Sequence, residues 1–365
     1  MISNKIISIK NILFSLIIIL AVISLSQGVL NALTNSQDFQ WSPTSLLRTG
    51  INPFNYVLND VKHEKIIMTQ IPNYFHGLYV IFLPFTFLNW EKAKLFFVFF
   101  NILITIHTIY NFTQHFKINS SFLILITTIY FSSTPFRVSL GNGQQSILIL
   151  YCFSLMLSNS YLKNVISGIG YFKYSFAPQF FFYLIFTRKY FKALLSILLL
   201  PVTFFIFIFL INDYNILNIL KQPLLISSIH VGPGVGDLMT IILDLNLFSV
   251  SKTFIFYLFI LLLSIIFSRL FYISNTTEFC NFTIACIISL LFYKHLIYDY
   301  IFLLPIFILS LINYNKFIYK FNLILIFYFW FIIRFINFNS LHILNFILLF
   351  ILLCTSFFSI NKLHK

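Results

Sequence analysis

Long apolar segments recur along almost the whole 365-residue chain, and this recurrence limits the folds that it can adopt. Hydrophobic residues make up 59% of the sequence and charged residues only 9%, with a mean hydropathy of +0.94. A segment of about 20 apolar residues crosses the hydrocarbon core of a bilayer as a helix. The sequence therefore predicts an all-α, multi-pass integral membrane protein.

Short turns separate the apolar runs, and no linker or soluble domain interrupts them. We predict about ten to twelve transmembrane helices in one membrane-embedded domain that covers residues 1–365. Lys5 and Lys10 precede the first run as in a signal peptide, but no A-x-A cleavage site follows, so we expect an uncleaved first helix. The predicted spans lie near residues 10–30, 74–90, 95–111, 120–136, 145–160, 165–186, 193–211, 253–271, 279–293, 296–312, 321–336 and 341–359.

Lys and Arg in the short connections predict the orientation, because such residues favour the cytoplasmic side. With twelve spans, both long connections, 31–73 and 212–252, lie on the opposite, extracytoplasmic side. The expected location is the bacterial inner membrane, with both termini cytoplasmic. The basic residues that this count assigns to the cytoplasmic side are Lys5, Lys10, Lys92, Lys94, Arg188, Lys189, Lys192, Lys316, Lys320, Lys362 and Lys365.

The net charge of +14 is spread in ones and twos. A nucleic-acid partner is not expected, because nucleic-acid binding would need a denser basic patch. The lipid bilayer is the expected partner of these charges. The four cysteines stand singly, and the sequence has no HExxH or Asp-x-Asp motif, so it indicates neither a redox site nor a metal or other cofactor.

Six of the nine carboxylates fall in the two long connections, which favours one extracytoplasmic site. The alternative is that loops carry charges in any membrane protein. In the first connection, Pro43 and Pro53 predict a structured loop with a short helix over 44–48. Asp38, between an apolar run and the aromatic residues Phe39 and Trp41, is either an interfacial carboxylate or a general base whose pKa partial desolvation raises.

Cations that a phosphate would meet also lie in the first connection. They are Arg48, Lys62, His63 and Lys65, and their alternative role is a solvated charge run. Lys173 stands alone inside an apolar run, so it either has a function or extends to the interface. His295 and Asp299 are four residues apart at the start of a predicted span, which predicts a His–carboxylate pair on one helix face. The glycine-rich segment 141–145 resembles an anion-binding turn but lacks the P-loop ending.

These segments, in this order, resemble the polyprenol-phosphate-dependent glycosyltransferases of the GT-C superfamily, and family 87 in particular. The resemblance covers roughly residues 10–310. Two departures are the four residues Tyr-Ser-Phe-Ala between Lys173 and Pro178, and a loose match at the late polar helix start. The matching elements are Asp38-Phe39, Gly50-Ile51-Asn52-Pro53-Phe54 with Tyr56, Ile71-Pro72-Asn73-Tyr74, Gly143-Gln144, Lys173 with Pro178, and Lys294 to Asp299 before Pro305.

The resemblance implies a GT-C-type helical bundle and a hexosyltransferase that uses a polyprenyl-phosphate sugar donor, with mannose as the known example, and a glycan or lipid acceptor. It implies a catalytic loop over 31–73 with Asp38 as the base for an inverting displacement. The expected substrate-binding residues are Arg48, Tyr56, Lys62, His63, Gln144, Lys173, His295 and Asp299. Since the span count puts Gly143-Gln144 on the cytoplasmic side, a site that includes this turn requires one nearby segment to be either re-entrant or miscounted.

Two other functional classes remain open from the sequence. A flippase or transporter for lipid-linked saccharides would favour ionisable groups near the bilayer midplane and paired broken helices. A polymerase that joins saccharide repeats would share the chemistry of the site. The concentration of carboxylates in loops on one face favours the glycosyltransferase.

Overall fold

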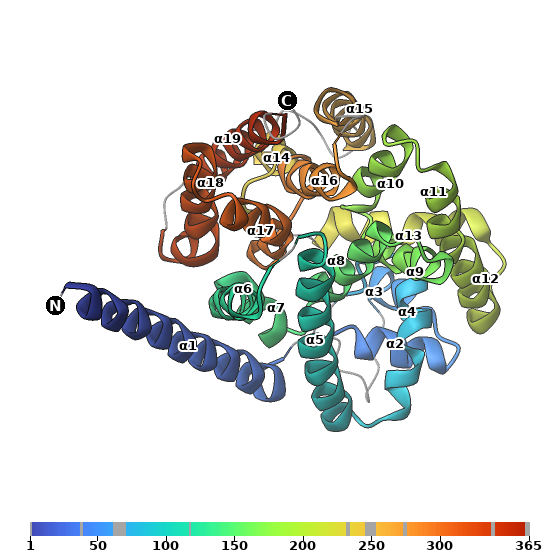
Figure 1. The fold of residues 1–365 in the computed structure, drawn as a ribbon. Helices are drawn as coiled ribbons and strands as arrows, with labels where there is room; N and C mark the ends of the chain where they lie inside the picture. Colours follow the sequence, from blue (N-terminus) through green and yellow to red (C-terminus); the bar gives the residue numbers. More distant parts are fainter. Residues whose placement is uncertain are drawn as a thin grey trace.

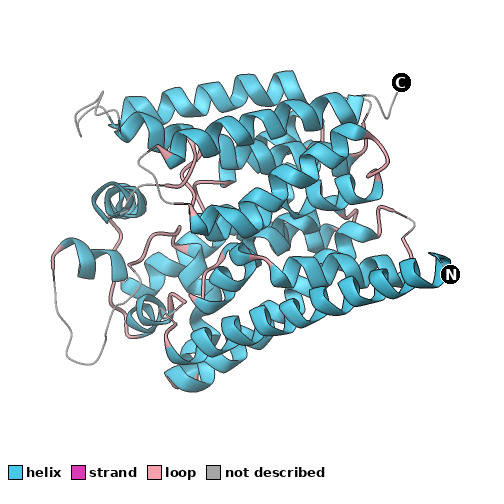
Figure 2. Ribbon diagram, turned by 90° about the vertical axis from the view of Figure 1, so that its left-hand side faces the viewer, coloured by secondary structure: helices cyan, strands magenta, loops and turns pink. Residues whose placement is uncertain are grey.

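A computed structural model of the protein describes residues 2–36, 39–60, 71–116, 118–230, 234–244, 253–272, 276–336 and 340–361. This described part is helical and contains no strand, which confirms the predicted all-α membrane fold (Figure 1). Long helices lie side by side, and shorter ones cross them at one end of the bundle (Figure 2). In that view α1 begins and α19 ends at the same end of the bundle, as expected from the sequence.

The described helices are divided by the break around Lys173 into a set that ends at Phe172 and a set that begins at Ala177. The first set is α1 (Ile2–Thr34), α2 (Trp41–Arg48), α3 (Pro53–Leu58), α4 (Gly77–Phe82), η1 (Leu83–Phe87), α5 (Trp90–Thr113), α6 (Ser120–Ser132), α7 (Thr134–Gly141), α8 (Ser146–Ser154), η2 (Leu155–Leu157), α9 (Tyr161–Ser167) and η3 (Gly168–Phe172). The second set is α10 (Ala177–Phe186), α11 (Tyr190–Ile197), α12 (Leu199–Ile211), α13 (Ile216–His230), α14 (Leu238–Asp244), α15 (Thr253–Phe271), α16 (Glu278–Phe292), η5 (Ile297–Leu303), α17 (Leu304–Ile312), α18 (Phe317–Phe327), η6 (Tyr328–Ile332), η7 (Ile333–Phe335) and α19 (Leu341–Asn361).

The number of full-length spans is smaller than expected. Within the described residues, five helical segments are long and apolar enough to cross a bilayer, and a sixth results if α6 and α7, bent by 62°, are one broken span. Seven further apolar helices have only 10–17 residues. The expected ten to twelve spans are too many by this measure, because several apolar runs form short or bent helices. The five segments are Asn11–Thr34, Trp90–Thr113, Tyr190–Ile211, Phe317–Phe335 and Leu341–Asn361.

The described part of the first long connection is structured, as the prolines predict. α2 covers the short helix expected over 44–48. α3 begins at Pro53, whose fixed φ suits a first helical position and whose missing N–H costs nothing there. The Asn52 side chain caps this helix by accepting a hydrogen bond from the backbone N–H of Phe54 at 3.0 Å.

The segment expected to span the membrane over 74–90 instead enters and leaves at the same end of the bundle. At its start, Gln40 Nε2 donates to the carbonyl of Ile71 at 3.3 Å. At its end, Trp90 stacks on Phe39 with a centroid distance of 5.4 Å. Because both contacts lie on neighbouring residues of the first connection, α4 and η1 form a re-entrant unit. This arrangement brings Gly143-Gln144 to the same end as the first connection.

The re-entrant unit reverses the side predicted for Lys92 and Lys94. Lys94 Nζ donates to the carbonyl of Leu33 at 2.7 Å, so the start of α5 lies at the end of α1. Since α1 is long enough to cross the bilayer, Lys92 and Lys94 lie at the opposite end of α1 from Lys10, and the prediction that they share a side with Lys10 is wrong. The other end of α5 lies near α16, where the rings of His115 and Phe279 are 5.4 Å apart.

Cysteine labelling from one side of the membrane tests this topology. In a background without the four native cysteines, an impermeant maleimide should label Thr49→Cys and Lys92→Cys in the same preparation of intact cells. It should reach Lys163→Cys and Tyr190→Cys only after permeabilisation, because these positions belong to the opposite end of α5. Labelling of position 92 together with position 190 would contradict the re-entrant unit and restore the twelve-span topology.

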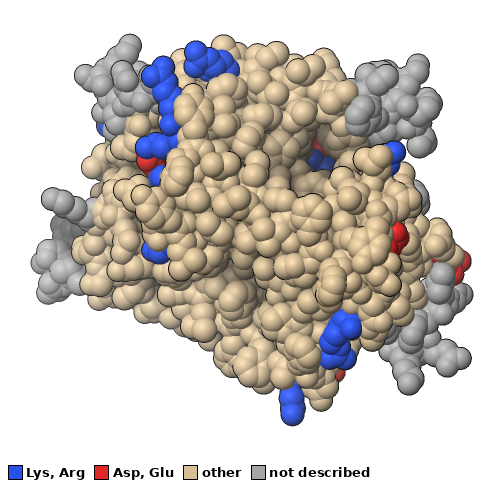
Figure 3. Space-filling view, turned by 90° about the vertical axis from the view of Figure 1, so that its right-hand side faces the viewer, with Lys and Arg blue, Asp and Glu red and all other residues tan. Residues whose placement is uncertain are grey.

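Charged groups are sparse on the outside of the bundle. The face in Figure 3 is mostly uncharged, and most of the lysine, arginine and acidic residues that it shows lie towards its edges. α12 and α15 expose large apolar side chains, including Phe205, Phe209, Leu262 and Ile266. A belt of this kind matches the hydrocarbon region of a bilayer, with charges towards the two interfaces.

Candidate functional site

A buried ion pair joins two segments that are 126 residues apart in sequence. Lys173 Nζ contacts Asp299 Oδ1, and the two side chains are 10% and 2% exposed. Lys173 is not inside a continuous helix, because the apolar run predicted as one span breaks between η3 and α10. Pro178 stands in the first turn of α10, where a proline is tolerated, and so fixes the start of the second helix. The break thus leaves Lys173 at a helix end with its side chain directed to Asp299.

Ser146 completes this cluster from a third segment. Its Oγ accepts a hydrogen bond from Lys173 Nζ at 3.0 Å and donates one to Asp299 Oδ1. The other carboxylate oxygen, Oδ2, accepts from the backbone N–H of Leu296 at 3.1 Å, which caps η5. Both oxygens of the buried carboxylate are therefore satisfied, as a buried charge requires. We refer to Ser146, Lys173 and Asp299 as the ionic cluster.

The glycine-rich turn before α8 positions Ser146. Gly143 has a φ of +61°, a conformation that glycine adopts without steric cost, and the chain reverses there. The next residue but one, Gln145, is buried and donates from Nε2 to the carbonyl of Phe39 at 2.9 Å. The turn therefore joins the ionic cluster to the first connection at Phe39, the residue that follows Asp38 in sequence.

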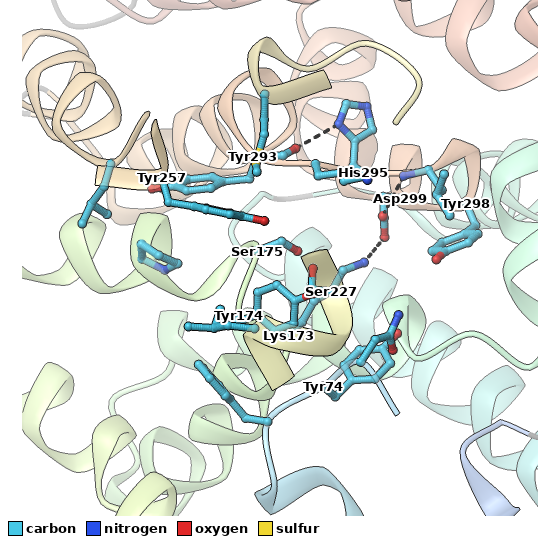
Figure 4. A pocket seen from close by; sticks show the side chains of 18 of the residues that line it. Tyr74, Lys173, Tyr174, Ser175, Ser227, Tyr257, Tyr293, His295, Tyr298 and Asp299 are labelled. Atoms are coloured by element: carbon cyan, nitrogen blue, oxygen red, sulfur yellow. Dashed lines mark hydrogen bonds and ion pairs between the residues drawn. The ribbon is translucent and has the colours of Figure 1, made fainter. Parts of the chain in front are cut away.

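Lys173 and Asp299 of the ionic cluster line a cavity of about 280 Å³. Figure 4 shows Lys173 and Asp299 joined at one side, with tyrosine side chains from several elements around the pocket. Aromatic rings with hydroxyl groups offer both apolar faces and hydrogen-bonding groups. The lining residues are Asn73, Tyr74, Phe75, Lys173, Tyr174, Ser175, Pro178, Leu224, Ser227, Met239, Tyr257, Leu258, Leu261, Tyr293, Lys294, His295, Leu296, Tyr298 and Asp299.

The cavity is recessed from the end where the first connection lies. α8 and η2 run from Ser146 to Leu157, about 20 Å at helical rise, whereas the neighbouring α5 is about 36 Å long. Both reach the same opposite end, because Gln114 and Leu157 line a common hollow there. The ionic cluster therefore lies part of the way into the thickness of the membrane.

A second buried pair, formed by Asp237 and His295, fixes the segment that borders the cavity. Asp237 Oδ2 is 3.6 Å from His295 Nδ1 and accepts from Thr240 Oγ1 at 2.9 Å. Burial raises the pKa of the Asp237 carboxyl, although His295 and the hydrogen bonds oppose this shift, and burial lowers the pKa of His295. Gly234 lies so close to Asp237 and Thr240 that a Cβ would fall 2.3 Å from both side chains, so this segment requires glycine there.

An amide interlock joins the first connection to α13, which also lines the cavity. Asn52 Nδ2 donates to Gln222 Oε1 at 3.0 Å, and Gln222 Nε2 donates to Asn55 Oδ1 at 2.7 Å. Gln222 is buried, so both hydrogen bonds are shielded from water. The interlock places α3 of the first long connection beside α13 of the second.

The structure brings some of the predicted site residues together and separates others. Lys173, His295 and Asp299 line the cavity. Arg48 instead donates to the carbonyl of Thr86 and lies over the Phe87 ring, while Tyr56 does not line the cavity. Gln144 does not line it either, and its neighbour Gln145 makes the contact with the first connection. Asp38, Lys62, His63, Glu64 and Lys65 lie outside the described residues.

The prediction that His295 pairs with Asp299 is wrong. No hydrogen bond or ion pair joins the two side chains, because η5 begins only at Ile297 and His295 precedes it. Asp299 pairs with Lys173, and His295 pairs with Asp237. The predicted pair requires one continuous α-helix across residues 295–299. Asp299 instead caps η5, which is a 3-10 helix.

Ser146 and Tyr74 are members of the site that sequence reasoning did not assign. Ser146 directly follows the glycine-rich turn, and Tyr74 ends the segment Ile71-Pro72-Asn73-Tyr74. The glycine-rich turn and the Ile71-Pro72-Asn73-Tyr74 segment point to these two positions, but a serine or a tyrosine is not distinctive in an apolar chain. Among the described residues, no three His, Cys, Asp or Glu side chains are grouped so that they could hold a metal ion.

A comparison with protein families identifies the chain. The model of "Glycosyltransferase family 87" matches residues 77–292, which is more than half of the sequence. The chain belongs to glycosyltransferase family 87. Comparisons with curated proteins and with solved structures gave no match. The matched part of this family 87 glycosyltransferase contains Ser146 and Lys173 of the ionic cluster, while Asp38 precedes it and Asp299 follows it.

Proposed function

We propose that this membrane glycosyltransferase transfers a hexose from a polyprenyl-phosphate-linked sugar to a hydroxyl group of a glycan or lipid acceptor. The observation that carries the proposal is the buried ionic cluster in the wall of the cavity. A lysine ammonium in a water-poor recess is costly unless it is paired or has a function. The cavity combines this cation with tyrosine side chains suited to a sugar ring.

Lys173 is the group that we assign to the donor phosphate. Its ammonium has three N–H donors, of which Ser146 and Asp299 take two, and one remains for a phosphate oxygen. The donor is a phosphodiester with one negative charge, and the leaving polyprenyl phosphate gains a second charge as the sugar–oxygen bond breaks. A fixed cation in a recess of low dielectric stabilises this developing charge more strongly than the ground state.

Asp38 is the group that we assign to the acceptor. Its carboxylate takes the proton of the acceptor hydroxyl while the acceptor oxygen bonds to the anomeric carbon and the sugar–phosphate bond breaks. The two residues that follow it support this role, because Phe39 and Gln40 have φ of 35° and 68°. Such left-handed backbone costs about 1–2 kcal/mol per residue without glycine, and strain of this kind is typical of functional segments.

Contacts on both sides hold the strained turn in place. The Phe39 ring stacks on Phe97 with a centroid distance of 4.4 Å, and its carbonyl accepts from Gln145. Gln40 is buried and bonds to the carbonyl of Ile71. This support favours a catalytic segment with one defined conformation. Direct displacement by the acceptor inverts the anomeric centre, and the proposed reaction uses no cofactor or divalent metal.

We also propose that transfer occurs at the extracytoplasmic face of a bacterial inner membrane, with both termini in the cytoplasm. The end of the bundle opposite the cavity carries Arg188, Lys189 and Lys192, with Glu278 as their neighbouring carboxylate. Basic residues in such short connections favour the cytoplasmic side.

A transfer assay tests the proposal directly. Purified protein in detergent should convert a radiolabelled polyprenyl-phosphate hexose and an acceptor into a glycosylated acceptor and polyprenyl phosphate. Nuclear magnetic resonance of the product should show the anomeric configuration opposite to that of the donor. Movement of the intact lipid-linked sugar across vesicle membranes without bond cleavage would instead support a flippase. Transfer from a nucleotide sugar alone would contradict the donor class.

A further inference from the structure

A second hollow, with a mostly polar lining, lies at the opposite end of α5 from the catalytic cavity. Its volume is about 250 Å³. It is separated from Ser146 by the length of α8 and η2, about 20 Å, and shares no lining residue with the catalytic cavity. Nothing in the proposed transfer reaction uses it. Its lining residues are Asn111, Gln114, His115, Ser154, Leu155, Leu157, Ser158 and Lys163.

The charge of this hollow favours an anion. Lys163 is exposed and forms no ion pair with any residue that the structure describes. Glu278, the nearby carboxylate, is already held by Lys189 at 2.6 Å and Lys192 at 3.0 Å. Lys192 also donates to the carbonyl of Met156, next to the lining residues Leu155 and Leu157. No aspartate or glutamate is among the described residues that line the hollow, so none of them neutralises its lysine charge.

The hydrogen-bonding groups of the hollow suit an oxyanion with hydroxyl groups attached. Asn111 and Gln114 contribute side-chain amides from the last turn of α5 and the residue after it, and His115 contributes an imidazole. Amide and imidazole N–H groups donate to phosphate oxygens, and a lysine adds a point charge. The shared chemistry is therefore that of a phosphate group.

The rim of the hollow identifies the source of the phosphate as lipid. Tyr161 and Leu162, directly before Lys163, are each 69% exposed, and Tyr190 and Phe191 beside them are 61% and 59% exposed. The rings of Tyr161 and Phe191 are 5.6 Å apart. Exposed aromatic residues next to cations are typical of the membrane interface, where the ring meets acyl chains and the polar tip meets headgroups.

We propose that this hollow binds the phosphate headgroup of an anionic phospholipid. Lys163 contacts the phosphate, the amides of Asn111 and Gln114 bind the headgroup hydroxyls, and the acyl chains lie against Tyr161 and Phe191. Bound lipid then bridges the end of α5 and the start of α9, two elements that the chain connects only through α6 to α8. The proposal is independent of the donor and acceptor of the transfer reaction.

Lipid titration of the purified protein tests this site. Phosphatidylglycerol added to detergent-solubilised protein should raise the Tm more than phosphatidylcholine does, because binding to the folded state stabilises it. Native mass spectrometry should show the same preference. Lys163→Ala should weaken the apparent affinity for phosphatidylglycerol roughly tenfold, the effect of losing one charged hydrogen bond.

The matched control is Lys320→Ala, which removes the same charge from an exposed lysine that does not line the hollow. It should change the affinity less than about twofold, since Lys320 does not line the hollow. Equal stabilisation by the two lipids, or equal effects of the two variants, would overturn the proposal. Stabilisation by inorganic phosphate alone, to the same degree as by phosphatidylglycerol, would make the hollow a site for a soluble phosphate and would also overturn it.

Discussion

Lys173→Met is expected to destabilise the folded protein by about 3–5 kcal/mol, because it leaves the buried carboxylate of Asp299 without its cation. Both side chains of the pair are at least nine-tenths buried, so water replaces the lost partner poorly. Methionine matches the length of the lysine stem and adds no cavity. Thermal unfolding in detergent measures the loss, and the transfer assay should detect no activity at the same time.

The double variant Lys173→Met with Asp299→Asn separates the structural role from the catalytic one. Without either charge the recess holds no unpaired ion, so most of the lost stability should return. Activity should stay lost, because the phosphate of the donor still lacks its cation. Lys189→Met is the matched control: its ion pair with Glu278 is 38% and 29% exposed and should contribute less than about 1 kcal/mol.

Two outcomes would contradict this account. A double variant that is both stable and fully active would show that Lys173 and Asp299 only hold the fold together. A single Lys173→Met variant as stable as the unmodified protein would show that Asp299 is protonated or solvated and that no buried ion pair exists.

The sequence predicts most helices well, because hydrophobic length is a local property. The runs near 253–271 and 341–359 correspond closely to α15 and α19. The run at 74–90 is also mostly apolar, yet it is re-entrant. Its topology depends on contacts with residues 39–41, and such contacts between distant segments leave no trace in the hydropathy of either segment.

The sequence also predicts single residues of the candidate site better than it predicts which residues pair with one another. Lys173 can be identified from the sequence, because a lone charge in an apolar run needs an explanation. Its partner cannot, since Asp299 is 126 residues away and its position depends on where η5 begins. The i, i+4 rule that suggested His295 for Asp299 holds only inside a continuous α-helix. Asp299 caps η5 at Leu296, and His295 lies before this cap and pairs with Asp237.

Asp38→Asn should lower turnover by about 10²–10⁴-fold, the usual contribution of a positioned general base. The amide keeps the size of the side chain but cannot accept the proton of the acceptor hydroxyl. Donor affinity should stay the same or increase slightly, because a negative charge near the donor phosphate is removed. Steady-state kinetics with the labelled donor, together with donor titration of the purified variant, measures the two quantities separately.

The controls are two other carboxylates of the same connection, Asp60→Asn and Glu64→Gln, and each should keep most of its activity. Asp60 is exposed and is the last residue of the described stretch 39–60, with a φ of 48°. A further variant, Gln145→Leu, removes the hydrogen bond to the Phe39 carbonyl and leaves Asp38 intact. If Asp38 is the base, loosening the turn beside it should reduce turnover less than removing the carboxylate does, and the pH dependence of the residual activity should be unchanged. Normal turnover of Asp38→Asn, with one of the carboxylate controls inactive, would move the base to that residue and leave Asp38 as an interfacial carboxylate.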